Sequence, residues 1–178
     1  MTQRALRLTY WISLAITFAT LGALAIIDQH LKTPASPLGI VSFELCAYGS
    51  SCDAIASSWG GEAKLQAAMS LGLDYLFMLA YPATICCGLL LLEKQVPASL
   101  KMPAMVLAWL VWGAGMSDAV ENYHLYQMLL GKPVIAHQWP ATIAASIKFA
   151  VLVPPLLAWL LATIWFSLPF QTRQAVKA

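Results

Sequence analysis

Residues 103–130 read PAMVLAWLVWGAGMSDAVENYHLYQMLL, and Asp118 and Glu121 are the only formally charged side chains in this stretch. A helix needs about 20 mostly apolar residues to cross a bilayer core, so the stretch predicts a membrane-spanning helix. Three further stretches have the same character, at about residues 8–28, 65–92 and 140–167. Helices satisfy their own backbone hydrogen bonds in lipid. The sequence therefore predicts an all-α, integral membrane four-helix bundle that forms one domain from residues 1–178.

The composition of the whole chain agrees with this class. Apolar residues make up 60% of the chain and charged residues 10%, with a mean hydropathy of +0.72, whereas about a quarter of the residues in a soluble domain are charged. The net charge is +2 and the chain has no basic cluster, which is unlike a nucleic-acid binder. A disordered chain has low hydrophobicity. We therefore expect membrane lipids as partners and no nucleic acid.

The first span has a competing interpretation as a signal peptide. Arg4 and Arg7 precede the apolar run, and residues 23–25 read Ala-Leu-Ala, which resembles a cleavage site. The apolar region of a cleaved signal peptide is about 7–15 residues long, and this run is longer. We therefore expect an uncleaved membrane anchor.

Basic residues predict the orientation of the bundle. They are more frequent in the N-terminus, the second loop and the C-terminal tail than in the first and third loops, and cytoplasmic segments are the ones enriched in Lys and Arg. Both termini are expected in the cytoplasm, of the inner or plasma membrane if the protein is bacterial, and the loop at residues 29–64 outside it. The first set is Arg4, Arg7, Lys94, Lys101, Arg173 and Lys177, and the second is Lys32, Lys64 and Lys132.

The outer loop has features of its own. Residues 39–45 are short and apolar enough to lie along the bilayer surface, and Asp53 is positioned to cap a short helix that ends at residues 60–61. Trp59 fits an aromatic belt at the outer interface. Cys46 and Cys52 are expected to form a disulfide if the loop faces an oxidising compartment. The alternative is two partly buried thiols in a tight turn.

Charged residues inside the spans are the main functional signal, because each one costs several kcal/mol in lipid unless it is paired or hydrated. At 1.5 Å per residue, Asp74, Asp118, Glu121 and Lys148 all lie about 22–27 Å above the cytoplasmic ends of their helices. Asp28, which ends the first span, lies at or slightly above this layer. Lys148 is the expected partner of Asp118 or Glu121. The layer is either a salt-bridge network that sets helix register, or a pocket with excess negative character.

The pocket interpretation assigns a role to each neighbouring residue. Asn122 shares a helix face with Asp118 and Glu121 because the three are spaced at i, i+3 and i+4, and Gly115 on that face permits close approach of another helix. In this interpretation the acids bind the polar or cationic head of a small amphiphile of lipid, sterol or isoprenoid type, and Lys148 offsets their charge. The predicted ligand-binding residues are Asp28, Asp74, Tyr75, Tyr81, Trp112, Asp118, Glu121, Asn122 and Lys148.

Whether the protein is an enzyme stays open at this point. An enzymatic variant of the pocket would use Glu121 or Asp118 as a general acid and base for proton transfer. The sequence contains no pattern that indicates a cofactor or a metal. Two other functions compete with ligand binding: a structural or accessory subunit of a membrane complex or homo-oligomer, and a proton-linked transporter.

Several short features follow one another in a recognisable order. Asp28 ends the first span, residues 73–82 (LDYLFMLAYP) place an acid early in a proline-containing span, residues 102–104 (Met-Pro-Ala) open the third span, and prolines 154–155 interrupt the fourth. This order resembles the EXPERA group, which includes emopamil-binding sterol isomerases and the sigma-two receptor and has four or five spans.

The resemblance implies a membrane-enclosed pocket in which acids such as Asp28 and Asp74 meet a cationic or sterol-like amphiphile. This sequence departs from the group in two respects. The isomerases use a histidine together with the acids, and the span at residues 65–92 has no histidine. The Asp118, Glu121 and Asn122 set and Lys148 have no counterpart in the pattern.

Overall fold

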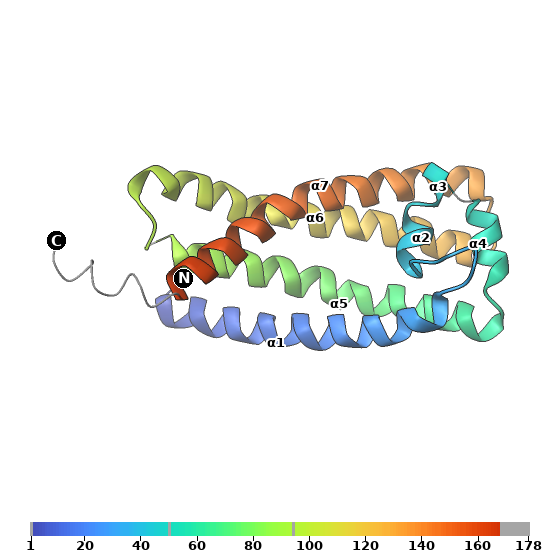
Figure 1. Cartoon of the computed structure of the whole chain (residues 1–178), viewed down its shortest axis with the longest axis horizontal. Helices are drawn as coiled ribbons and strands as arrows, with labels where there is room; N and C mark the ends of the chain where they lie inside the picture. The colour runs from blue at the N-terminus through green and yellow to red at the C-terminus, as the bar shows by residue number, and fades with distance from the viewer. Residues whose placement is uncertain (1, 50, 94, 168–178) are drawn as a thin grey trace.

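The computed structural model describes residues 2–49, 51–93 and 95–167, and this part of the chain is helical throughout its regular structure, with no strand. Four long helices form a bundle, and three short helices and one 3-10 turn lie at one end of it (Figure 1). The long helices are α1 (Gln3–Asp28), α5 (Gly61–Leu92), α6 (Ala98–Leu129) and α7 (Val134–Ser167). The short elements are η1 (Gln29–Leu31), α2 (Ile40–Glu44), α3 (Cys46–Gly49) and α4 (Cys52–Ser58).

The four long helices are long and apolar enough to cross a membrane, as predicted. Their bounds extend beyond the predicted spans, because hydropathy marks only the apolar part of a helix. The helices α5, α6 and α7 begin at Gly61, Ala98 and Val134 rather than at residues 65, 103 and 140. The tail residues Arg173 and Lys177, together with Lys94, lie outside the described residues.

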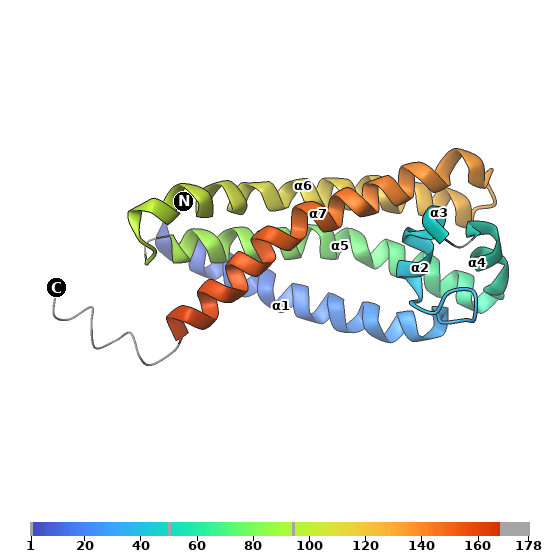
Figure 2. The same ribbon diagram turned by 45° about the horizontal axis from the view of Figure 1, so that its top comes forward.

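The order of packing places α1 and α7 at opposite sides of the bundle. The helix α5 packs on α1 and α6, and α6 packs on α7. At the end that holds the short helices, called the loop end below, α2 lies between α1 and α7 (Figures 1 and 2). Toward the opposite end, called the terminal end, α7 leaves α6 and crosses toward α1. The space between α1 and α7 is therefore wider at the loop end.

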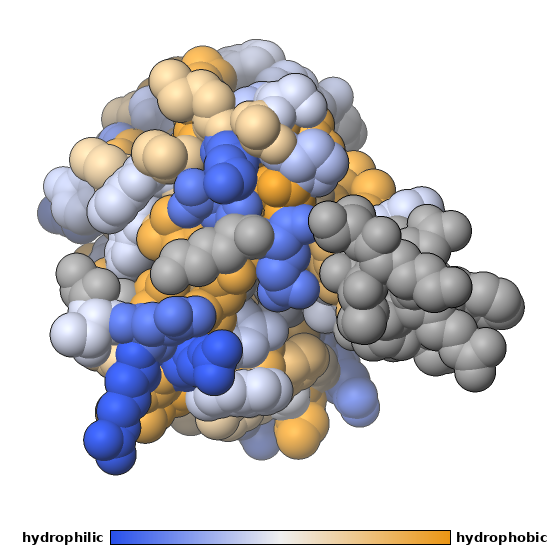
Figure 3. All heavy atoms as spheres, turned by 90° about the vertical axis from the view of Figure 1, so that its left-hand side faces the viewer, coloured by the Kyte–Doolittle hydropathy of each residue, from blue (hydrophilic) through white to orange (hydrophobic). Residues whose placement is uncertain are grey.

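A glycine allows the central pair of helices to approach closely. A β-carbon at Gly115 of α6 would lie 2.7 Å from the carbonyl oxygen of Met78 in α5, a distance that real side chains do not adopt. The expectation that Gly115 permits close helix contact is therefore confirmed. At the terminal end, hydrophilic side chains surround an apolar centre (Figure 3).

The segment expected on the bilayer surface instead enters the bundle. Phe43 and Glu44 of α2 are buried, so the surface prediction for residues 39–45 is wrong. The Asp28 carboxylate accepts a hydrogen bond from the backbone N–H of Ile40 (2.7 Å). Gly39 has φ 59°, a conformation that favours glycine, and a β-carbon there would overlap the Asp28 carboxylate. The end of α1 therefore holds α2 in place.

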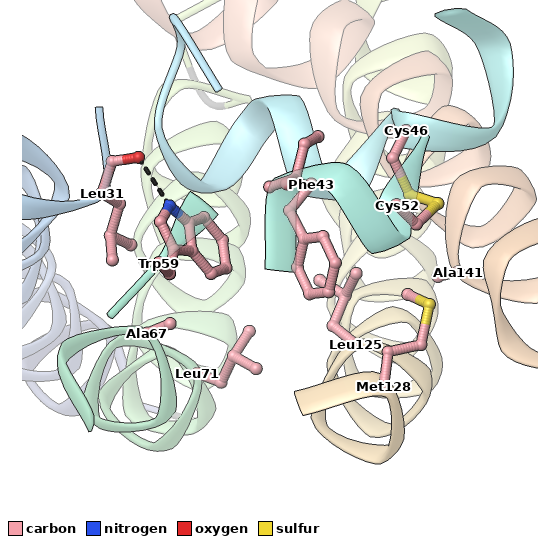
Figure 4. Packing of buried hydrophobic residues seen from close by; sticks show 11 residues of the cluster. Leu31, Phe43, Cys46, Cys52, Trp59, Ala67, Leu71, Leu125, Met128 and Ala141 are labelled. Atoms are coloured by element: carbon pink, nitrogen blue, oxygen red, sulfur yellow. Dashed lines mark hydrogen bonds between the residues drawn. A yellow bond between two sulfur atoms is a disulfide. The ribbon is translucent and has the colours of Figure 1, made fainter. Parts of the chain in front are cut away.

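The loop end has its own apolar cluster (Figure 4). Trp59 is at its centre and is 1% exposed, so its prediction as an interfacial belt residue is wrong. Its indole N–H donates to the carbonyl of Leu31 (2.8 Å), and its ring meets Phe43 edge to face. Cys46 and Cys52 lie at disulfide-bonding distance, as predicted.

The cap of α4 differs from the prediction by two residues. Ser51 is the N-cap, and its hydroxyl accepts a hydrogen bond from the N–H of Ala54 (3.3 Å). Asp53 lies in the first turn instead, where a negative charge suits the helix dipole. The helix ends at Ser58 and leads directly into the buried Trp59.

Candidate functional site

Lys148 is the centre of the buried charges. Its Nζ lies 2.8 Å from Glu121 Oε2 and 3.1 Å from Asp118 Oδ1, both on α6, and 3.4 Å from Glu44 Oε2 on α2. The predicted pairing of Lys148 with Asp118 or Glu121 is thus present with both residues. All four side chains are at least nine-tenths buried. Three helices that are distant in sequence meet at this lysine.

The charge balance of this cluster is uneven. One ammonium group contacts three carboxyl groups, and carboxylates in a low-dielectric interior repel one another unless some of them are protonated. Burial raises the pKa of Glu44 above its ordinary value, and Lys148 opposes that effect. The cluster as a whole has more acid than a single lysine compensates.

Glu44 is the site residue that sequence reasoning missed. The hydroxyl of Thr142 on α7 donates to the Glu44 carbonyl (2.9 Å) and accepts from the N–H of Ala47 (3.4 Å). These bonds fix α2 against α7 and direct the Glu44 side chain to Lys148. The available signal was an acid in an otherwise apolar segment, residues 39–45, which is unsuited to lying at a lipid surface by its apolar face alone.

Asp74 belongs to the same region but does not contact Lys148 in the structure. Its Oδ2 accepts a hydrogen bond from Asn122 Nδ2 (2.7 Å), so α5 and α6 are joined one turn above Asp118. The hydroxyl of Tyr81 on α5 donates to Asp118 Oδ2 at 3.5 Å. The predicted placement of Asn122 on the face of Asp118 is confirmed by these contacts.

A cavity of about 340 Å³ adjoins these groups. Its rim includes Leu21 of α1 and Phe149 of α7, which are 46% and 37% exposed, whereas Asp118 and Lys148 on its wall are buried. The cavity therefore opens sideways between α1 and α7. Its polar lining consists of Asp28, Glu44, Ser70, Asp74, Tyr81, Asp118, Asn122 and Lys148.

Three residues predicted for the pocket do not line this cavity. Tyr75 is 46% exposed, because it follows Asp74 directly and consecutive helical residues point about 100° apart. Tyr81 lines the cavity because it is two turns from Asp74. Trp112 packs against the apolar cluster of the terminal half. Glu121 is fully buried and contacts Lys148 from outside the cavity.

Asp28 has a structural role as well as a place on the wall. In addition to its bond with Ile40, its carboxylate lies 3.9 Å from Lys32 Nζ. The acid at the end of the first span therefore holds α2 against α1, and this contact shapes one side of the cavity.

No protein family, curated protein or solved structure matches this chain. The similarity to the EXPERA group therefore stays a prediction, and the functional argument rests on the geometry of the site.

Proposed function

We propose that this is an integral membrane protein that binds a small amphiphile, with the polar head of the ligand in the cavity beside Asp74, Asp118 and Lys148. The observation that carries the proposal is a cavity with buried charged groups on its inner wall and an apolar rim that opens sideways. Ligand pockets have volumes of about 300–1,000 Å³, and this cavity falls in that range. A purely structural ion-pair network requires no such space.

The orientation follows from the charges of the connecting segments. The terminal end is cytoplasmic, because basic residues are concentrated there, and the loop end is on the opposite side. The pairing of Cys46 and Cys52 supports this orientation, since disulfides persist in oxidising compartments.

The charge of the wall selects the ligand head. Lys148 contacts three acids, and Asp74 adds a fourth carboxyl group to the cavity. A cationic or hydroxyl-bearing head complements this wall, whereas a phosphate or carboxylate head is repelled by it. An amphiphile with an amine or alcohol head is therefore the preferred ligand class.

An enzymatic variant of this function assigns proton transfer to Asp118 rather than to Glu121. Asp118 lines the cavity and contacts both Lys148 and the Tyr81 hydroxyl, and Glu121 does not reach the cavity. A general acid and base has to lie within hydrogen-bonding reach of the substrate.

The proposal is tested by equilibrium binding of radiolabelled dodecylamine to the protein in bilayer nanodiscs, with empty nanodiscs as the measure of lipid partitioning. We expect saturable binding that Asp74→Asn weakens about tenfold, the loss of one charge-assisted contact. Glu62→Gln is the matched control, because Glu62 lies on the same helix, is exposed and does not line the cavity. Absence of saturable binding of dodecylamine and of dodecanol would contradict the proposal.

A further inference from the structure

A second hollow continues from the cavity toward the terminal end. It has a volume of about 280 Å³ and lies between α1, α5 and α7. Apart from Thr17, Thr84 and Tyr81, its wall is built from hydrocarbon and aromatic side chains. The cavity and this apolar groove share four residues, so they form one continuous space. The shared residues are Leu21, Phe77, Tyr81 and Leu152.

The apolar groove ends where α7 reaches the other two helices. Trp159 of α7 packs on Gly88 of α5, where a β-carbon would overlap its indole ring. The Tyr10 ring of α1 meets Trp159 edge to face at 6.5 Å. These three residues, called the floor below, close the space between α1 and α7 at one level.

The position of the floor sets the length of the space. Asp74 and Gly88 lie on the same helix, and their separation in sequence corresponds to about 21 Å along its axis. The groove residues recur about once per turn on each helix: Leu14, Phe18 and Leu21 on α1, and Leu152, Leu156 and Leu160 on α7. This is an elongated trough, suited to one linear chain.

The groove is also accessible from the side. Phe18 is 61% exposed and Leu160 40% exposed, whereas Thr84 and Ile85 behind them are buried. A chain from the surrounding lipid therefore reaches the trough between α1 and α7 without passing through water.

We propose that the apolar groove is the tail site of a linear, single-chain amphiphile with a cationic head, whose head lies at Asp74 and whose chain runs to the floor at Trp159. This inference rests on the proposed function and specifies its ligand. The head is assigned by the acidic wall of the cavity and the tail by the continuity of the two spaces. Because lipid is as apolar as the groove, tail selectivity comes from steric fit and not from transfer out of water.

The test compares a short and a long amine on variants that fill the groove. Radiolabelled octylamine and tetradecylamine are bound to the protein in nanodiscs. Leu156→Trp fills the groove, and the matched control is Leu157→Trp, because Leu157 is its neighbour on α7, is 51% exposed and lines neither space. Leu156→Trp is expected to weaken tetradecylamine binding about tenfold, as overpacking does, and to leave octylamine binding unchanged. Leu157→Trp leaves both unchanged.

A second variant tests the floor and does not depend on the folding of the first. Trp159→Ala opens the space beyond Gly88 and is expected to improve octadecylamine binding about tenfold relative to tetradecylamine. If the wild type binds neither octylamine nor tetradecylamine, the proposed function fails. If both amines bind and neither variant changes the dependence on chain length, the proposed function stands and the tail site is overturned.

Discussion

The loop half and the terminal half of the bundle are built from the same four helices, yet they close the space between α1 and α7 in different ways. At the loop end an inserted segment, α2, joins both helices through polar contacts to Asp28, Thr142 and Lys148. In the terminal half α7 itself crosses to α1 and closes the gap with Trp159. Direct helix contact leaves room only for packing, whereas an inserted segment leaves a cavity beside it. The polar groups lie where the cavity is.

The largest effect is expected from Lys148→Met, which removes the cation of the loop half. Three buried carboxyl groups then have no counter-charge, and loss of one partner of a buried pair costs about 4 kcal/mol. Titration with dodecyl sulfate, followed by circular dichroism, measures the free energy of unfolding. Lys101→Met, at an exposed position in α6, is the control and should leave it unchanged. Equal stability of the two variants would show that the buried acids need no cation.

Gly39→Ala tests the junction through which α1 holds α2. The added β-carbon meets the Asp28 carboxylate at a residue with φ 59°, and the combined strain is expected to cost about 3 kcal/mol. Gly22→Ala is the matched control, because Gly22 has open space around it in α1 and alanine favours helix by about 1 kcal/mol. The same titration distinguishes them. A neutral Gly39→Ala variant would mean that α2 is not held by Asp28.

Removal of the disulfide tests whether the two halves open independently. The double variant Cys46→Ser with Cys52→Ser frees a short loop and is expected to cost about 2 kcal/mol. Amide hydrogen exchange should rise in residues 40–58 and stay unchanged in residues 104–112 of α6. A uniform increase over both segments would show that the bundle opens as one unit.

The smallest effect is a pH dependence located at Glu44. Because burial raises its pKa, the folded protein holds this proton more tightly than the unfolded chain does. The resulting stability is present at acidic pH and is lost as the pH rises through the raised pKa. The groups that face Glu44 are Lys148, Asp74 and Glu121.

Between about pH 5 and about pH 8, the unfolding temperature of the wild type should therefore fall relative to that of Glu44→Gln. Glu62→Gln, at the exposed start of α5, should follow the wild type. Parallel curves for the wild type and Glu44→Gln would place the titrating group elsewhere.

Prediction from sequence succeeded where a regular helix relates position in the chain to position in space. The constant rise per residue placed Asp118, Glu121 and Lys148 at one depth, and all three meet in the structure. It failed where only the direction of a side chain mattered. Tyr75 and Tyr81 were both predicted to line the pocket, but only Tyr81 shares a face with Asp74 and reaches the cavity.

The sequence by itself determined four long apolar helices and a layer of charges within them, because hydropathy and helical rise are local properties. The tertiary structure alone decided what covers that layer. An apolar segment such as residues 39–45 has the same composition whether it lies on a surface or enters a bundle, and Trp59 suits an interface or a core equally. Only the contacts of α1 and α7 with α2 bring Glu44 to Lys148 and leave a cavity beside Asp74.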